Sequence, residues 1–179
     1  ILNLGLVENI FNLERVLINY LIILIYLLIF NYLNKLYLGD SGSYLLGLSS
    51  GILLITLYNN IDNISPFFIV LLLWYPCFEN LFSIIRKYKF NSSPLEADNK
   101  HFHQLLFNYL KKKFNYSNLF TNNFSSILIN LFNLLIFFIA SNDIFSSRLQ
   151  ISLIFLCMTV YGFLYFKLFN FRFRIKRKV

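Results

Sequence analysis

The sequence KLYLGDSGS at residues 35–43 is a short polar break between two long apolar runs. Residues 16–33 before the break are apolar except for two asparagines, and residues 44–58 after it are also largely apolar. An apolar run of about 20 residues crosses the hydrocarbon core of a bilayer as a helix. The second run is short for a span unless its helix begins inside the break. The pattern predicts a loop at a membrane face, where Asp40 lies beside hydroxyl groups and glycines.

The composition of the whole chain is that of a membrane protein. Of its 179 residues, 58% are hydrophobic and 13% are charged, whereas soluble domains carry about 25% charged residues. Further apolar runs follow at residues 66–85, 124–140 and 149–169. We predict an all-α, polytopic bundle of about five transmembrane helices, forming a single membrane domain over residues 1–179. The run lengths disfavour a soluble fold with a large core.

Two smaller expectations concern the start of the chain and its cysteines. Residues 1–15 mix charged and apolar side chains, and they are expected to form the end of a preceding helix followed by a loop. Cys77 and Cys157 both lie in apolar runs without a CxxC partner. They predict two buried thiols.

The third apolar run contains two prolines and an acid. Pro66 suits the first position of a helix, which needs no N–H donor, whereas Pro76 lies in mid-span and is expected to kink the helix. Glu79 follows one turn later and needs a polar partner or a watery cavity, because lone acids are costly at membrane depth. Arg86 lies seven residues beyond Glu79, on about the same helical face.

Basic residues gather on one predicted side of the membrane. Residues 86–123 contain seven Lys and Arg residues and the end of the chain from Lys167 contains six, whereas residues 59–65 and 141–148 contain only Arg148. The positive-inside rule predicts that 86–123 is a cytoplasmic loop and that 170–179 is a basic cytoplasmic tail against anionic lipid. Two spans separate the break from this loop, so both polar segments are expected on the cytoplasmic face. The charge requires no nucleic-acid partner.

A second polar cluster, SSPLEADNKHFHQ at residues 92–104, lies inside the predicted loop. Asp98 precedes apolar residues at helical spacing, from Phe102 to Phe114, which predicts an amphipathic helix on the membrane surface. Asp98 is expected to be its N-cap, a catalytic group, or both. Three interpretations of His101 and His103 stay open: a polar rim of this helix, a zinc site that lacks a third good ligand other than Asp98, or a pair acting on one ligand. The last alternative predicts an irregular backbone at 101–103, because residues two apart share a face only when extended.

Together the two polar clusters suit chemistry on phosphates. A carboxylate holds Mg²⁺, which prefers carboxylates together with substrate phosphates. Glycines and hydroxyl groups let a loop cradle phosphate oxygens, and histidines and arginine stabilise developing negative charge. Phosphoryl-type transfer onto a lipid phosphate fits this set of groups, and ion binding in a transporter fits it less well.

These residues resemble those of the polyprenyl-phosphate N-acetylhexosamine-1-phosphate transferases, glycosyltransferase family 4. Residues 35–43 with Gly47 match the family's Gly-Asp loop. A second family pattern is matched by Pro76 to Arg86, Ser93-Pro94, Asp98, His101 and His103. The likeness covers about residues 5–140 and is closer to the undecaprenyl-phosphate GlcNAc-1-phosphate members than to the muramoyl-pentapeptide members.

The resemblance implies transfer of HexNAc-1-phosphate from a UDP-HexNAc to undecaprenyl phosphate, with release of UMP. This is the first membrane step of a cell-envelope polysaccharide pathway at the inner membrane, and it requires Mg²⁺ or Mn²⁺. Asp40 is then the catalytic carboxylate or the metal ligand, and Arg86 has a supporting role. The substrate-binding residues implied are Lys35, Ser41, Gly42, Ser43, Arg86, Asp98, His101 and His103.

The family's adjacent Asp-Asp pair and its Asp-Gly loop do not occur in this sequence, which has eight acidic residues, no two of them adjacent. We therefore expect this chain to be the C-terminal part of such an enzyme and to be inactive by itself. Homodimer formation is left open. A non-enzymatic transporter or scaffold, with Asp40 and Glu79 along a polar path, is the alternative. The GDSGS string at 39–43 is also similar to the nucleophile loop of trypsin-like proteases, but that fold is a soluble pair of β-barrels.

Overall fold

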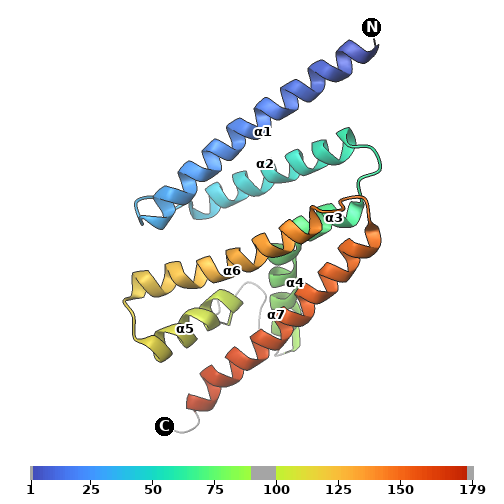
Figure 1. The fold of residues 1–179 in the computed structure, drawn as a ribbon. Helices are drawn as coiled ribbons and strands as arrows, with labels where there is room; N and C mark the ends of the chain where they lie inside the picture. The colour runs from blue at the N-terminus through green and yellow to red at the C-terminus, as the bar shows by residue number, and fades with distance from the viewer. Residues whose placement is uncertain (1, 90–99, 177–179) are drawn as a thin grey trace. The chain divides into compact units, whose positions relative to one another are not determined.

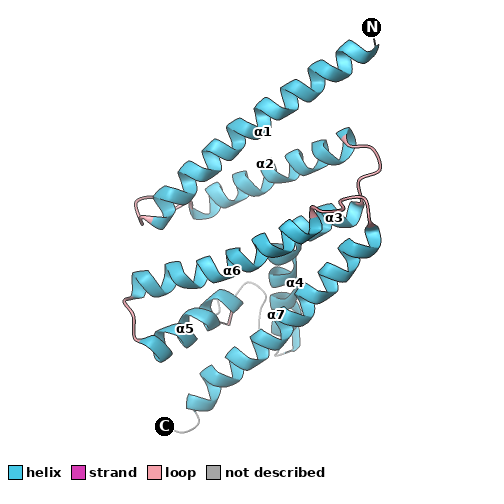
Figure 2. Ribbon diagram, viewed as in Figure 1, coloured by secondary structure: helices cyan, strands magenta, loops and turns pink. Residues whose placement is uncertain are grey.

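The computed structural model describes residues 2–89 and 100–176, and these residues form helices joined by short connections (Figures 1 and 2). The described part contains no strand. Among the described residues, four helices are long and apolar enough to cross a membrane, and one sharply bent pair of helices makes a fifth candidate. The prediction of an all-α chain with about five apolar, span-length segments is therefore confirmed. Contacts along the chain divide it into two compact units, Ile1–Asn63 and Ile64–Val179.

The first unit consists of α1 (Leu2–Tyr32) and α2 (Gly39–Asn60). The expectation of a loop before residue 16 was wrong, because α1 is continuous from Leu2. The stretch lacks proline, and its leucine, glutamate and arginine residues are good helix formers. Tyr20 on α1 joins the two helices, since its hydroxyl oxygen lies 2.7 Å from Ser50 Oγ and 3.0 Å from Ser49 Oγ on α2.

The second unit begins with α3 (Pro66–Leu72) and α4 (Trp74–Lys89), which meet at an angle of 70°. The kink predicted from Pro76 is present. Pro76 has no N–H to donate to the carbonyl oxygen of Leu72, and its ring crowds that carbonyl group. The helix accordingly breaks at Leu73, whose N–H donates instead to Val70 O at 3.2 Å.

The rest of the second unit consists of α5 (Phe102–Phe114), α6 (Asn118–Ala140) and α7 (Ser147–Lys176). The predicted amphipathic helix exists as α5, but its apolar face packs against α6 and α7. Phe102, Leu105 and Leu110 are buried there, so protein rather than a membrane surface covers this face. The region predicted as a basic tail begins inside α7.

Polar contacts fix the connections at the other end of the second unit. Ser65 N–H donates to Ile144 O at 3.0 Å, and Ser65 Oγ lies 2.9 Å from Ser147 Oγ. The fully buried Gln150 donates to the carbonyl oxygens of Ala140 and Asp143 at 3.0 and 2.8 Å. These bonds hold the start of α3 and the α6–α7 connection together.

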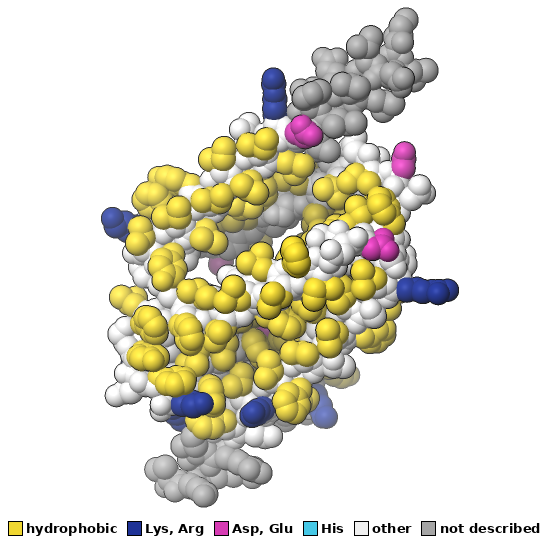
Figure 3. Space-filling view, in the orientation of Figure 1, with side chains coloured by type: hydrophobic (Ala, Val, Ile, Leu, Met, Phe, Trp, Pro, Cys, Tyr) yellow, Lys and Arg dark blue, Asp and Glu magenta, His cyan; other side chains and the backbone are white. Residues whose placement is uncertain are grey.

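Apolar side chains also cover the outside of the long helices, and only a few Lys and Arg side chains interrupt them in this view (Figure 3). No residue of α2 is buried. Cys157 is buried as predicted, whereas the prediction for Cys77 was wrong, because it is exposed on α4. An apolar residue exposed on a span-length helix faces lipid rather than water when the helix is in a membrane, so the apolar run at Cys77 did not require burial in protein.

Candidate functional site

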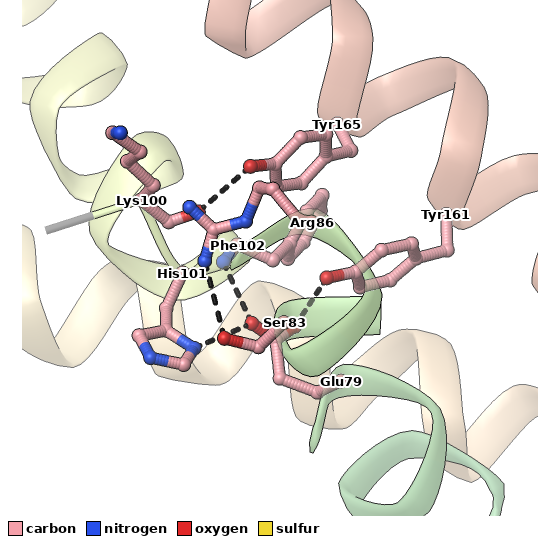
Figure 4. A network of polar contacts seen from close by, with 8 residues as sticks. All are labelled: Glu79, Ser83, Arg86, Lys100, His101, Phe102, Tyr161 and Tyr165. Atoms are coloured by element: carbon pink, nitrogen blue, oxygen red, sulfur yellow. Dashed lines mark hydrogen bonds and ion pairs between the residues drawn. The ribbon is translucent and has the colours of Figure 1, made fainter. Parts of the chain in front are cut away.

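The carboxylate of Glu79 on α4 is the centre of a polar network in the second unit (Figure 4). Glu79 is only 9% exposed. Its Oε1 accepts a hydrogen bond from the backbone N–H of Phe102 at 3.0 Å and lies 3.0 Å from His101 Nδ1. Its Oε2 accepts a hydrogen bond from the Tyr161 hydroxyl group on α7. Glu79, which was expected to need a polar partner, therefore has three partners: Phe102 of α5, the N-cap residue His101, and Tyr161 of α7.

Glu79 caps a helix to which it does not belong. The first N–H groups of a helix have no partner within the helix, and no side chain in the N-cap position of α5 supplies one. The Glu79 carboxylate takes this role at Phe102, where negative charge also interacts favourably with the helix dipole. One side chain thus orders the start of α5 and orients the residue before it.

The contact with Glu79 determines which nitrogen of His101 carries the proton in the neutral ring. An ionised carboxylate is only an acceptor, so the geometry assigns the proton of His101 to Nδ1. Nε2 is then the nitrogen on the side of the ring away from Glu79. It accepts a hydrogen bond when the ring is neutral and donates one when the ring is protonated. The His101 side chain is 27% exposed, which leaves part of its ring accessible.

His103 lies against His101. The two rings are stacked, with centroids 5.9 Å apart and an angle of 19° between their planes. His101 has an extended backbone (ψ 150°) and α5 begins at Phe102, so the irregular backbone expected for joint action on one ligand is present. Burial is the main cause that lowers the pKa of His103 below 6.5; His101 lowers this pKa further, and Glu79 opposes the shift.

Arg86 lies next to this network. Glu79, Ser83 and Arg86 occupy one face of α4, as their spacing of four and three residues requires. Arg86 is 8% exposed, and its Nη2 donates to Ser83 Oγ at 3.1 Å. Figure 4 shows its guanidinium group pointing toward the segment that contains Lys100 and His101. A buried cation and two imidazoles therefore lie at the start of α5.

The residues of the Gly-Asp loop lie in the first unit, at the start of α2. The loop ends at Leu38, so Asp40, Ser41, Gly42 and Ser43 are in the first turns of α2. The second long apolar helix begins inside the break at Gly39, which makes it 22 residues long. Gly39 has φ +62°, a backbone conformation that glycine adopts without strain. Asp40 is exposed, and Ser43 Oγ donates to Gly39 O at 2.8 Å.

The helix start provides N–H groups and a favourable dipole for an anion, and Asp40 provides a carboxylate for a cation. Lys35 is exposed in the preceding connection. Among the residues that the structure describes, no three His, Cys, Asp or Glu side chains form a metal site. Asp40 supplies a single carboxylate, and Mg²⁺ in proteins is held by as few as one or two carboxylates when phosphates and water complete its ligands.

The structure thus brings together Arg86, His101 and His103, all in the second unit. Asp40 and its neighbours belong to the other unit, so the association of the two clusters remains a prediction. Asp98, like Ser93 and Pro94, lies outside the described residues. The prediction that Asp98 is the N-cap of the amphipathic helix was wrong, because α5 begins at Phe102 and its N-cap is His101.

Sequence reasoning missed two tyrosines of α7. Tyr161 donates to Glu79, and Tyr165 donates to Lys100 O at 3.0 Å. Both are almost fully buried, at 3% and 2% exposure. Their spacing of four residues places two hydroxyl groups on one face of an apolar helix. That spacing was the signal in the sequence that could have indicated them. Buried hydroxyl groups need hydrogen-bond partners, and the sequence showed no partner for Glu79 either.

Comparisons with models of protein families, with curated proteins and with solved structures find no match to this chain. Any assignment of function therefore depends on the motifs of the sequence and on the geometry of the Glu79 network.

Proposed function

We propose that this chain forms part of a polyprenyl-phosphate HexNAc-1-phosphate transferase. The reaction moves HexNAc-1-phosphate from a UDP-HexNAc to undecaprenyl phosphate and releases UMP. The main support from the structure is the Glu79 network, which fixes the His101 ring through Nδ1 beside His103 and Arg86. The match of both polar segments to the family's motifs supports the same function.

The second unit would bind the nucleotide-sugar. Glu79 holds His101 Nδ1–H, so Nε2 would donate to a phosphate oxygen from the protonated ring or accept from a sugar hydroxyl group in the neutral ring. Arg86 would add positive charge beside the same phosphates, where charge develops on UMP as the pyrophosphate bond between the sugar-1-phosphate and UMP breaks. Asp98 would contribute from the segment just before His101.

The first unit would supply the carboxylate. Asp40 would hold Mg²⁺, or Mn²⁺, together with the substrate phosphates, and Lys35, Ser41, Gly42 and Ser43 would lie around these phosphates. When bound, the ion would neutralise the charge of the pyrophosphate. Asp40 and the helix start at Gly39 would orient the phosphate groups for attack by the lipid phosphate.

The proposed setting is the inner membrane, with both polar clusters and the C-terminal end of α7 on the cytoplasmic side. The distribution of Lys and Arg along the sequence supports this orientation. The long apolar helices would then place the lipid phosphate and the soluble nucleotide-sugar at one membrane face.

The alternative of a non-enzymatic transporter or scaffold requires Asp40 and Glu79 to line a polar path. Glu79 is a poor candidate for such a path, because both of its oxygens are already engaged in hydrogen bonds inside the protein. An acid that binds a passing ion needs oxygens that can exchange partners.

Ligand binding tests the proposal directly. The chain would be expressed with the sequence encoded directly upstream of it, and its thermal unfolding in detergent would be followed with UMP and Mg²⁺, and with AMP and Mg²⁺ as control. The proposal predicts a higher unfolding temperature with UMP that disappears when Mg²⁺ is chelated. Equal responses to UMP and AMP, or no response to either, would contradict the proposed nucleotide specificity.

A further inference from the structure

A pocket of about 390 Å³ lies among α4, α5, α6 and α7 of the second unit. Aromatic and aliphatic side chains form most of its walls, including Trp74 on α4, Leu106 on α5, Phe132 on α6 and Leu164 on α7. The amide of Asn133, which also lines it, already accepts a hydrogen bond from Trp74 Nε1 at 3.0 Å. Mostly apolar pockets of this size are typical of ligand sites.

The pocket lies within one half of the predicted membrane thickness. Lys167 follows Ser147, the first residue of α7, by twenty residues, which is a rise of about 30 Å along a helix. The hydrocarbon core of a bilayer is about 30 Å thick. With Ser147 at one interface, Lys167 is therefore at the level of the opposite headgroups. The lining residues Val160 and Leu164 are closer to the centre of the membrane than Lys167, at the level of the acyl chains of the same leaflet.

The charge of the pocket is positive and lies at its headgroup end. Among the described residues that line the pocket, Lys167 is the only charged one. Its side chain is exposed, and the long stem of a lysine lets the ammonium group reach the headgroup level while the stem stays on apolar surface. Basic pockets between transmembrane helices recognise anionic lipid headgroups.

We propose that this pocket binds one acyl chain of an anionic glycerophospholipid, with the lipid phosphate against the Lys167 ammonium group. The apolar walls select a hydrocarbon chain, and Lys167 selects a negative headgroup. The inference depends on the pocket and on the span-length helices around it, and it does not depend on the proposed transferase activity. The bound lipid would fill the space between α6 and α7 and brace α5.

The chain contains a built-in reporter for this site. Trp74 is its single tryptophan, lines the pocket and is 5% exposed. The intact chain would be reconstituted in phosphatidylcholine vesicles that contain increasing fractions of a lipid brominated in mid-chain. One series would use brominated phosphatidylglycerol and the other brominated phosphatidylcholine, because bromine quenches tryptophan fluorescence on contact. We expect half-maximal quenching by brominated phosphatidylglycerol at a lipid fraction about fivefold lower than the fraction of brominated phosphatidylcholine that is needed. One lysine at an anionic headgroup supplies a preference of this size.

Two variants locate the preference. Lys167→Gln should abolish the difference between the two lipids, whereas Lys112→Gln, on an exposed position of α5, should keep it. Leu164→Phe narrows the pocket and should weaken quenching by both lipids. Equal quenching of the wild-type chain by the two lipids, or equal loss of preference in both lysine variants, would overturn the proposal. Recovery of Trp74 emission when undecaprenyl phosphate is added at the same lipid fraction as the brominated phosphatidylglycerol would also overturn the proposal, because the pocket would then bind the lipid substrate.

Discussion

Glu79 Oε1 lies 3.0 Å from His101 Nδ1 and 3.0 Å from the backbone nitrogen of Phe102. A single carboxylate oxygen therefore joins the side chain of the N-cap residue of α5 to the first N–H of that helix. Because α4 supplies the carboxylate, the position of His101 depends on the packing of two helices.

Glu79→Gln should disturb His101 without removing it. The amide keeps one acceptor oxygen but presents an NH₂ donor in place of the other, so it cannot satisfy Phe102, His101 and Tyr161 together. Hydrogen bonds to charged groups contribute about 1.5 to 3 kcal/mol, so transfer by the complete enzyme should fall about tenfold to a hundredfold. Nitrogen NMR of His101 should show a mixture of tautomers. Glu14→Gln, on the exposed surface of α1, is the matched control, and an unchanged His101 spectrum in the Glu79 variant would refute the assignment.

Tyr161→Phe removes one donor from the buried Glu79 and leaves the aromatic packing in place. A buried polar atom that loses its partner costs about 1 to 3 kcal/mol, so the free energy of unfolding should fall by that amount. Tyr44→Phe is the comparison, since Tyr44 is 77% exposed and should show little change. Denaturant unfolding in detergent measures both. Equal stability of the two variants would mean that the Tyr161 hydroxyl group contributes nothing to the network.

His103 should make the stability of the second unit depend on pH. Burial lowers the pKa of His103 in the folded chain below its ordinary value of 6.5. At pH values between the folded-state pKa and 6.5, the unfolded chain therefore binds more protons than the folded chain. The contribution of His103 is therefore complete above pH 6.5 and is lost as the pH falls through the lower, folded-state pKa. The effect should be small, because the ring is also exposed to solvent. Unfolding midpoints between pH 5 and 8 should fall at the acid end for the wild type, and His103→Gln should flatten this slope. An identical slope in the variant would assign the pH dependence to other groups.

Gly39→Ala tests the start of α2, where Asp40 is held. Gly39 has φ +62°, and a residue with a Cβ in this conformation is strained by about 1 to 2 kcal/mol. Thermal unfolding should show that loss. Gly51→Ala provides the contrast, because Gly51 lies inside α2 with open space around it, and alanine there should stabilise the helix by about 0.5 to 1 kcal/mol. Stabilisation of both variants would exclude the left-handed turn at Gly39.

The sequence was informative where a single segment determines the outcome. Apolar runs predicted the long helices, and Pro76 predicted the bend between α3 and α4, because these effects act within a few residues. The partners of Glu79 could not be predicted in the same way. Tyr161 is 82 residues away in the sequence, and only the packing of α4 against α7 brings the two side chains together. For the same reason, the amphipathic pattern of α5 was assigned to a membrane surface, whereas α6 and α7 cover its apolar face.

Transfer of radiolabelled HexNAc-1-phosphate from UDP-HexNAc to undecaprenyl phosphate is the direct test of the proposed activity. It would be measured in membranes that contain the chain together with the sequence encoded upstream of it. The account predicts Mg²⁺-dependent transfer in the wild type, no detectable transfer in Asp40→Asn, a loss of about a hundredfold in His101→Ala, and unchanged transfer in the control Lys112→Gln. Wild-type transfer in both Asp40→Asn and His101→Ala would contradict it.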